Sequence, residues 1–473
     1  MASAGLYGWL FVAAGLGPWC AWPAEGEGPT DVPSGPEQLK ARKQTTVVTV
    51  DAPTDAVSTT NAPAPLYDWD FRWKAWDGIH FELTRKTYLG TELTDLAHLP
   101  VLRLDETRMA GKLGAKFALD AAAFVADDAF DDFDNGAELR RARLYARGDC
   151  LLVLPVSYEL EIGYIPGQFY IENTFLEFHQ LGILGSLKGG QFQVPMSMVN
   201  YGSSRDMMFM EPASVLQAIA PGVNAGLQLG RPVFADRLTW ALGLFTDAAG
   251  EDFGDATEGF GRAVGRLSGL PVYQYDPEHP DSQRLLHLGL SGSVLYAGES
   301  IVRYRSRPES HLAPYLVDTG EMKADGAYTA GFETAWVNGP LCLQGEALHS
   351  WLQGQDGRNS DFGGIYASAS WFLTGESRPY DRRTGTFGRV IPKRDFHFDG
   401  GGWGAWEVAA RYSYLNLNNG DVDGGRLSMF MAGVNWYLHS HVKWRFDYGF
   451  GHVSGRQPDG NLNLFQTRLE LDF

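Results

Sequence analysis

The chain has 473 residues and a formal net charge of −18 at pH 7, which suits several soluble domains or one large barrel and argues against nucleic acid as a partner. Its mean hydropathy of −0.21 is too polar for a bundle of membrane-spanning helices, and no apolar run after residue 25 has the length of a spanning helix. The 57 glycines, 27 Phe, 20 Tyr and 14 Trp are typical instead of many strands joined by tight turns.

The first 110 residues divide into three segments. Residues 1–24 contain an apolar run and are interpreted as a signal peptide for secretion, although no Lys or Arg precedes the run. Residues 25–65 are rich in Pro, Thr, Glu and Ala, and we expect a disordered periplasmic linker. Residues 66–110 are expected to form an N-terminal hairpin and extension, which turns at Asp77-Gly78 and plugs or braces a barrel mouth.

Alternation of apolar and polar residues is sustained from residue 111 to the end. The final segment places Phe465, Leu469 and Phe473 on one face and charged residues on the other. A soluble protein rarely ends on an exposed strand with an aromatic tip, because such an edge promotes aggregation. A strand with one lipid face and one water face, closed into a barrel, avoids that problem. The alternative is the last strand of a soluble sandwich, but no helical segments are present to cover so many aromatic faces.

The pattern predicts an all-β fold, a sixteen-stranded antiparallel transmembrane β-barrel over residues 111–473, in the bacterial outer membrane. Because such barrels have an even number of strands, a seventeenth candidate at 301–307 is assigned to a long extracellular loop, 297–326. Residues 374–403 then form a long periplasmic connection. The expected strands begin near residues 111, 137, 154, 168, 184, 222, 236, 259, 284, 327, 341, 362, 404, 425, 441 and 462.

Motifs spread over residues 111–473 resemble the phosphate- and pyrophosphate-selective porins. The matching segments are 136–143, 190–195, 203–211, 304–309, 371–376 and 401–473. The resemblance implies a trimeric outer-membrane barrel that passes small anions through a lumen lined with basic side chains. It also implies that the third loop, here residues 194–221, folds inward and narrows the lumen. Gln193 stands where the family often has Lys, which weakens the expectation of phosphate.

Anion selectivity needs basic groups spaced so that an ion passes from one to the next, and the planar fork of Arg fits phosphate. Arg141, Arg143 and Arg147 share one face of a strand whose other face is apolar, and they are predicted to form an arginine ladder. Arg140 is expected on the apolar side, toward lipopolysaccharide or another subunit. The predicted anion-pathway residues are Arg141, Arg143, Arg147, Lys112, Lys116, Arg205, Arg303, Arg305 and Arg307.

A structural role for these basic residues remains open, because carboxylates also face the lumen. Arg205 is expected either to face the pore or to pair with Glu211. The inward-facing carboxylates are Glu159, Glu161, Glu346, Glu407, Asp447, Glu470 and Asp472.

Neither catalysis nor a cofactor is expected, since the chain has no Gly-x-Ser-x-Gly, His-Glu-x-x-His, P-loop or Cys-x-x-Cys motif. The acidic connection 125–135 is interpreted as a solvated loop rather than a calcium site, so no metal is expected. Cys150 and Cys342 are interpreted as unrelated thiols.

The leading hypothesis is an outer-membrane porin for passive diffusion of small anions such as phosphate or polyphosphate. Its expected partners are small inorganic anions, outer-membrane lipid and the other copies of a homotrimer. The alternatives are a weakly selective general porin and a structural or adhesive barrel plugged by residues 25–110.

Overall fold

The structure is a computed structural model. It describes residues 67–74, 77–89, 102–130, 133–151, 154–165, 167–246, 261–296, 301–355, 357–456 and 459–473. The expected signal peptide, 1–24, and linker, 25–65, lie outside the described residues. Within those described ranges, none of the helices has the length and apolar character of a membrane span.

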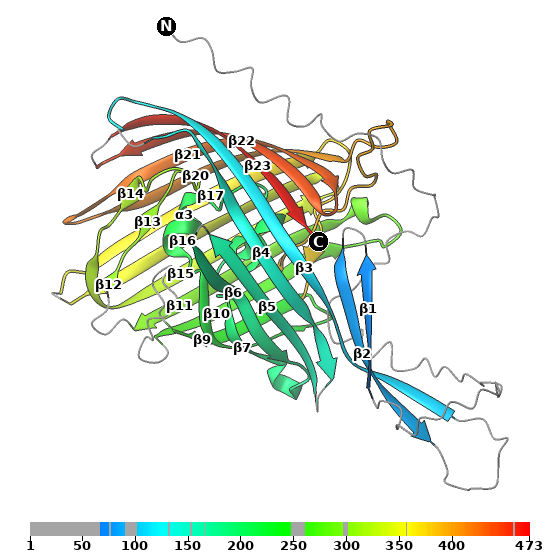
Figure 1. Cartoon of the computed structure of the whole chain (residues 1–473). Helices are drawn as coiled ribbons and strands as arrows, with labels where there is room; N and C mark the ends of the chain where they lie inside the picture. Colours follow the sequence, from blue (N-terminus) through cyan, green and yellow to red (C-terminus); the bar gives the residue numbers. More distant parts are fainter. Residues whose placement is uncertain are drawn as a thin grey trace, which may run out of the picture. The chain divides into compact units, whose positions relative to one another are not determined.

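Sixteen strands in the described ranges pair with their neighbours in an antiparallel ring (Figure 1). The ring closes where the last strand pairs with the first, with Asp472 opposite Lys116. The predicted barrel is confirmed. Its strands are β3 Leu102–Ala126, β4 Gly136–Leu151, β5 Pro155–Ile165, β6 Gln168–Phe178, β7 Ser186–Gln193, β8 Val223–Val233, β9 Leu238–Phe245, β10 Arg262–Gln274, β11 Arg284–Tyr296, β15 Met322–Asn338, β16 Leu341–Gly354, β17 Ser360–Phe372, β20 Ala405–Asn419, β21 Val422–His439, β22 Val442–Ser454 and β23 Gly460–Asp472.

The outer wall is apolar and the inner wall is charged. Leu119 and Leu144 are exposed on the outside, whereas Asp120, one residue further along β3, is buried on the inside. In β23, Phe465 is exposed and Arg468 is fully buried. Side chains alternate between the two faces of a strand, so each strand presents one face to lipid and one to the lumen.

The final residue completes the seam of the barrel. The amide of Phe473 donates to the carbonyl of Ala115 at 3.0 Å, and the amide of Ala115 donates back at 2.9 Å. Tyr145 Oη donates to the same Phe473 carbonyl at 2.9 Å. Gly114 lies beside this contact, where an added Cβ would stand 2.0 Å from the Phe473 oxygen. The close approach therefore needs glycine.

An N-terminal hairpin precedes the barrel. It consists of β1 Tyr67–Lys74 and β2 Gly78–Leu89, and Gly78 in the turn has a φ of +80°. β2 pairs with the first half of β3, where Ile79 is opposite Leu113. The first barrel strand therefore starts at Leu102 instead of near residue 111, because its first half pairs with the hairpin before β23 joins it.

Three long connections fold into the ring of strands (Figure 1). The first follows β7 and contains α2 Met198–Tyr201, η3 Ser204–Asp206 and α3 Ser214–Ile219. The second follows β11 and contains β12 Ile301–Val302, β13 Arg305–Ser306 and β14 Val317–Asp318, and the third contains β18 Tyr380–Asp381 and β19 Thr386–Phe387. Short turns elsewhere include η2 Gly182–Leu184 and η4 Pro280–Ser282.

The second and third connections add no strand to the ring. Among the described strands, β13 pairs with β14 alone and β18 with β19 alone. β12 adds two residue pairs to the edge of β15, opposite Lys323 and Met322. The assignment of 301–307 to a loop is therefore confirmed, and the count of sixteen is unchanged.

Candidate functional site: lumen and constriction loop

The loop over residues 194–221, called the constriction loop below, is held in place by basic side chains of the barrel wall, which donate hydrogen bonds to its backbone carbonyls. Lys443 Nζ donates to the carbonyl of Met207 at 3.2 Å. Arg445 donates to the carbonyls of Phe209 at 2.8 Å and Arg205 at 2.7 Å. Both cations come from the inward face of β22, where alternation places every second residue in the lumen.

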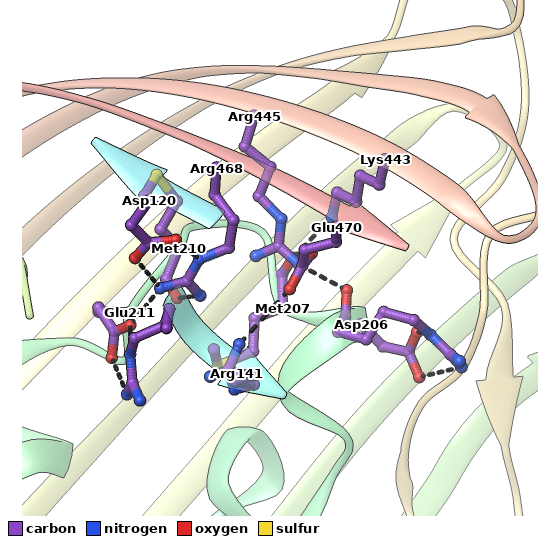
Figure 2. A network of polar contacts seen from close by, with 12 residues as sticks. Asp120, Arg141, Asp206, Met207, Met210, Glu211, Lys443, Arg445, Arg468 and Glu470 are labelled. Carbon is purple, nitrogen blue, oxygen red and sulfur yellow. Dashed lines mark hydrogen bonds and ion pairs between the residues drawn. The ribbon is translucent and has the colours of Figure 1, made fainter. Parts of the chain in front are cut away.

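Arg468 of β23 ties the same loop to the wall. Its guanidinium bonds both carboxylate oxygens of Asp120, at 2.7 and 2.6 Å, and it also donates to the carbonyl of Met210 at 2.6 Å (Figure 2). A further bond of 2.6 Å reaches Glu211 in the loop. Because Arg468 is fully buried, its charge is neutralised by these carboxylates rather than by water.

Glu211 is the acidic partner that the loop contributes. Arg140 donates to its two carboxylate oxygens at 3.1 and 3.3 Å. Burial by itself raises the pKa of Glu211, but Arg140, Arg468 and Arg141 outweigh it and hold that pKa well below its ordinary value of 4.5. The carboxylate therefore stays charged at neutral pH.

The expectation that Arg140 faces lipid is wrong. The register between β3 and β4 shifts so that Ala118 pairs with Arg141 and Leu119 pairs with Leu139. Arg140 is the extra residue of a β-bulge, and its side chain reaches inward to the loop. Strict alternation fails at a bulge, which the sequence did not reveal.

Two more anchors hold the loop. Glu346 of β16 accepts the amides of Met198 at 3.1 Å and Val199 at 3.2 Å, at the start of α2. On the other side, Arg411 donates to the carbonyl of Glu211 at 3.1 Å. The neck of the loop closes where Gln193 donates to the carbonyl of Pro221 at 3.1 Å.

Two members of the predicted ladder are engaged in ion pairs. Arg141 is buried and lies 3.4 Å from a carboxylate oxygen of Glu470. Arg143 lies 3.1 Å from Glu161 and 3.0 Å from Glu172. Both face the lumen as predicted, but each is matched by carboxylates.

The third member, Arg147, is exposed on the inward face of β4 and has no ion pair within 4.0 Å in the part of the chain that the structure describes. Its guanidinium lies 4.9 Å from the ring centre of Tyr145. The ammonium groups of Lys112 and Lys116 lie 5.7 and 5.2 Å from the same centre. Each lysine also donates to a carboxylate at 2.7 Å. We name Lys112, Lys116, Tyr145 and Arg147 the Tyr145 cluster.

Arg205 is paired, although not with Glu211. It lies 3.1 Å from Asp206 and also contacts Asp472 at the end of β23. Arg389, from the third connection, contacts the same Asp472 carboxylate. The pairing with Glu211 that the sequence left open is therefore wrong.

Arg303, Arg305 and Arg307 stabilise their own connection. Arg303 donates to Asp318 at 2.8 Å. The guanidinium groups of Arg305 and Arg307 lie 4.0 and 4.6 Å from the ring centre of Tyr315. They gather around β13 and β14, and their role in an anion pathway stays a prediction.

Glu309 draws that second connection inward. Its carboxylate accepts the Ser214 amide at 2.9 Å at the start of α3, and it contacts Arg411 and Ser413 of β20. Gln466 of β23 donates to the Glu309 carbonyl at 3.1 Å. The second connection and the constriction loop therefore pack on one another inside the barrel.

Sequence reasoning missed the basic residues that anchor the constriction loop. Alternation already placed Lys443, Arg445 and Arg411 on inward faces, but it gave no sign of the backbone that passes over them. The missed residues are Arg378, Arg411, Lys443, Arg445 and Arg468.

Other chemistry is sparse in the described ranges. They contain no group of three or more His, Cys, Asp and Glu side chains arranged to hold a metal ion. Cys150 and Cys342 are both free thiols.

Comparison with known proteins agrees with this architecture. The profile of the family described as "Phosphate-selective porin O and P" matches residues 112–473. An uncharacterized protein of Caulobacter vibrioides is 30% identical over 365 residues, which cover 72% of this chain and 68% of that protein. Porin O of Pseudomonas aeruginosa is 25% identical over 259 residues, covering 48% of this chain and 57% of that porin. OmpT, an outer-membrane protein of Vibrio cholerae solved in its trimer form, shares the fold with a TM-score of 0.50 at 11% identity, over 77% of this chain and 100% of that chain.

Proposed function

Because the chain belongs to the family of phosphate-selective porins O and P, outer-membrane channels and not enzymes, we propose that it admits small anions by passive diffusion and favours them over cations. The Tyr145 cluster is the observation that carries this proposal. Arg147 presents a guanidinium to the lumen without a carboxylate partner among the described residues, and two ammonium groups lie on the same aromatic ring.

Small inorganic anions with several oxygens, phosphate among them, suit this cluster. A guanidinium offers two parallel N–H donors to such an anion, and each hydrogen bond to a charged group contributes about 1.5–3 kcal/mol. The description of the family as phosphate-selective supports phosphate as the solute to test first. Gln193 closes the neck of the constriction loop, so its departure from Lys does not remove a cation from the Tyr145 cluster.

We also propose that three copies form the working porin. The resemblance seen in the sequence implies a trimer, and the solved OmpT with the same fold is a trimer. The outward apolar faces described above provide the lipid contact of each barrel.

A weakly selective porin is the second candidate. It is favoured by the pairing of Arg141 and Arg143 with carboxylates, since paired charges attract neither sign of ion strongly. A plugged structural barrel is the third, because three connections fold into the lumen.

Current through single channels in a salt gradient separates the three. For the wild type, we expect a reversal potential on the anion-selective side. Arg147→Ala should lower the anion-to-cation permeability ratio severalfold, toward the factor of ten that about 1.4 kcal/mol represents. Arg358→Ala is the matched control, because Arg358 lies at the opposite end of the barrel, 3.3 Å from Asp421. An unchanged ratio in Arg147→Ala would favour the weakly selective porin, and the absence of any current would favour the plugged barrel.

A further inference from the structure

The N-terminal hairpin carries a large exposed apolar face. Trp69, Phe71 and Trp73 are 50%, 61% and 65% exposed and share one side of β1. Ile79 and Phe81 of β2 lie on that side opposite them, and the rings of Trp69 and Phe71 each lie within 6.4 Å of the Phe81 ring. We name these five residues the hairpin face. Its other side carries the charged residues Asp70, Arg72 and Lys74.

The hairpin face continues the outer wall of the barrel. Ile79 pairs with Leu113, and Leu113 and Phe117 belong to the exposed, outward side of β3. The Trp73 ring lies 6.4 Å from the ring of Phe473, the last residue of the barrel seam. Apolar surface therefore passes without a break from the barrel onto the hairpin.

The hairpin continues the lines of the last two barrel strands, β22 and β23, beyond the end of the barrel at Phe473. Residues 109–113 of β3 pair with β4 on one edge and with β2 on the other. β23 uses that second edge further along, from Lys116 onward. β2 therefore follows the end of β23 in the same line, and β1 follows β22.

Lipid does not reach this face. Trp444, with the rings of Trp436 and Trp406 stacked beside it, marks the membrane–water boundary at this end of the barrel. Trp444 is in register, through β23, with Leu119 of β3, whereas Trp73 is in register, through β2, with Leu113.

Leu119, in register with Trp444, and Leu113, in register with Trp73, are six residues apart on β3, which is about 20 Å along a strand. A strand tilt of about 40° makes this about 15 Å along the membrane normal. The headgroup layer is only about 6 Å thick. The hairpin face therefore projects beyond the lipid into water.

We propose that the hairpin face packs against the neighbouring copy of this chain, an inference that rests on the trimer proposed above. Three exposed aromatic side chains beside an edge of β1 that pairs with no strand among the described residues would promote aggregation if water alone covered them. Aromatic residues are instead enriched in subunit interfaces. A neighbouring copy is present at this height in every trimer, because symmetry gives each copy the same surface at the same depth.

Photo-crosslinking tests the occupant directly. A benzophenone amino acid placed at position 71 should join two copies in the assembled porin, and the same group at position 72, on the charged side, should not. Adducts at position 71 that contain lipid or a different protein would overturn the inference. The absence of any adduct at that position would overturn it as well, because the face would then contact only water.

The stability of the oligomer provides the second measurement. The variant Trp69→Ser/Phe71→Ser/Trp73→Ser should dissociate into folded barrels at a lower temperature than wild type on unheated gels. The matched variant Asp70→Ser/Arg72→Ser/Lys74→Ser should dissociate at the wild-type temperature. Equal dissociation temperatures for all three proteins would overturn the inference. A monomeric wild type with anion-selective current would also overturn the inference, but it would leave the proposed anion selectivity intact. A crosslink between copies of a non-selective trimer would support the inference and overturn the proposed anion selectivity.

Discussion

Residues in the lumen that look alike in sequence have two different tasks. Arg445 and Arg468 are fully buried, and they donate to loop carbonyls and carboxylates. Arg147 is exposed and rests on an aromatic ring. A guanidinium that is fully buried cannot be reached by a passing anion, whereas an exposed one can. Exposure, rather than residue type, therefore distinguishes an anchor from a candidate pathway group.

Removing a buried anchor should be costly. Arg468→Met leaves Asp120 and Glu211 buried without their shared cation, which typically costs about 3–5 kcal/mol. We expect a correspondingly lower urea midpoint for unfolding of the purified barrel. Adding Asp120→Asn to Arg468→Met should recover part of the loss, because one uncompensated charge disappears. Equal stability of Arg468→Met and wild type would show that water already solvates this pair.

At the scale of elements, the constriction loop owes its position to strands distant in sequence. β16 holds its start through Glu346, and β20, β22 and β23 hold residues 205–211. The bulge in β4 adds Arg140 to the same set. Most of these contacts end on backbone atoms, so the loop sequence itself need not be complementary to the wall.

Glu346→Gln should separate loop mobility from barrel stability. A neutral amide accepts the Met198 and Val199 amides more weakly than a carboxylate does. We expect noisier open-channel current and faster proteolysis within the loop. Unfolding stability should not fall, because Glu346 stands opposite Glu333 and the change removes a like-charged neighbour. Glu278→Gln, in an exposed turn, is the control, and wild-type current noise in Glu346→Gln would contradict the anchoring role.

At the scale of the whole molecule, closure of the ring stabilises a barrel whose apolar side chains face outward and whose charged side chains face inward. Every strand in the ring is paired on both edges, so no backbone edge of the barrel meets lipid. The seam depends on the main chain of Phe473, which exchanges two hydrogen bonds with Ala115 and accepts a third from Tyr145. The aromatic side chain takes no part in those bonds.

Phe473→Ser should therefore leave the finished barrel intact. We expect wild-type conductance and heat-modifiable migration, because the Phe473 side chain makes none of the seam hydrogen bonds. Deleting Phe473 should be more harmful, because the three hydrogen bonds at the seam are lost. Equal unfolding midpoints for the deletion and Phe473→Ser would show that the seam bonds contribute nothing.

Much of the fold could be predicted from the sequence, because strands in a barrel are patterned locally. Alternation with period 2 located all sixteen strands, and parity of the strand count kept residues 301–307 out of the ring. The sequence also placed Arg141, Arg143 and Arg147 on the inward face of one strand.

Outside the bulge in β4, the sequence by itself thus determined which of the predicted strand residues face the lumen, and only the tertiary structure decided what each one does there. The bulge at Arg140, the partners of Arg205 and the anchors Arg445 and Arg468 all depend on contacts between segments far apart in the chain. A charged side chain acts through whichever group reaches it, and that group is supplied by loops whose paths carry no periodic pattern. In regular strands alternation therefore fixes the direction of each side chain, whereas the folded loops fix its partner.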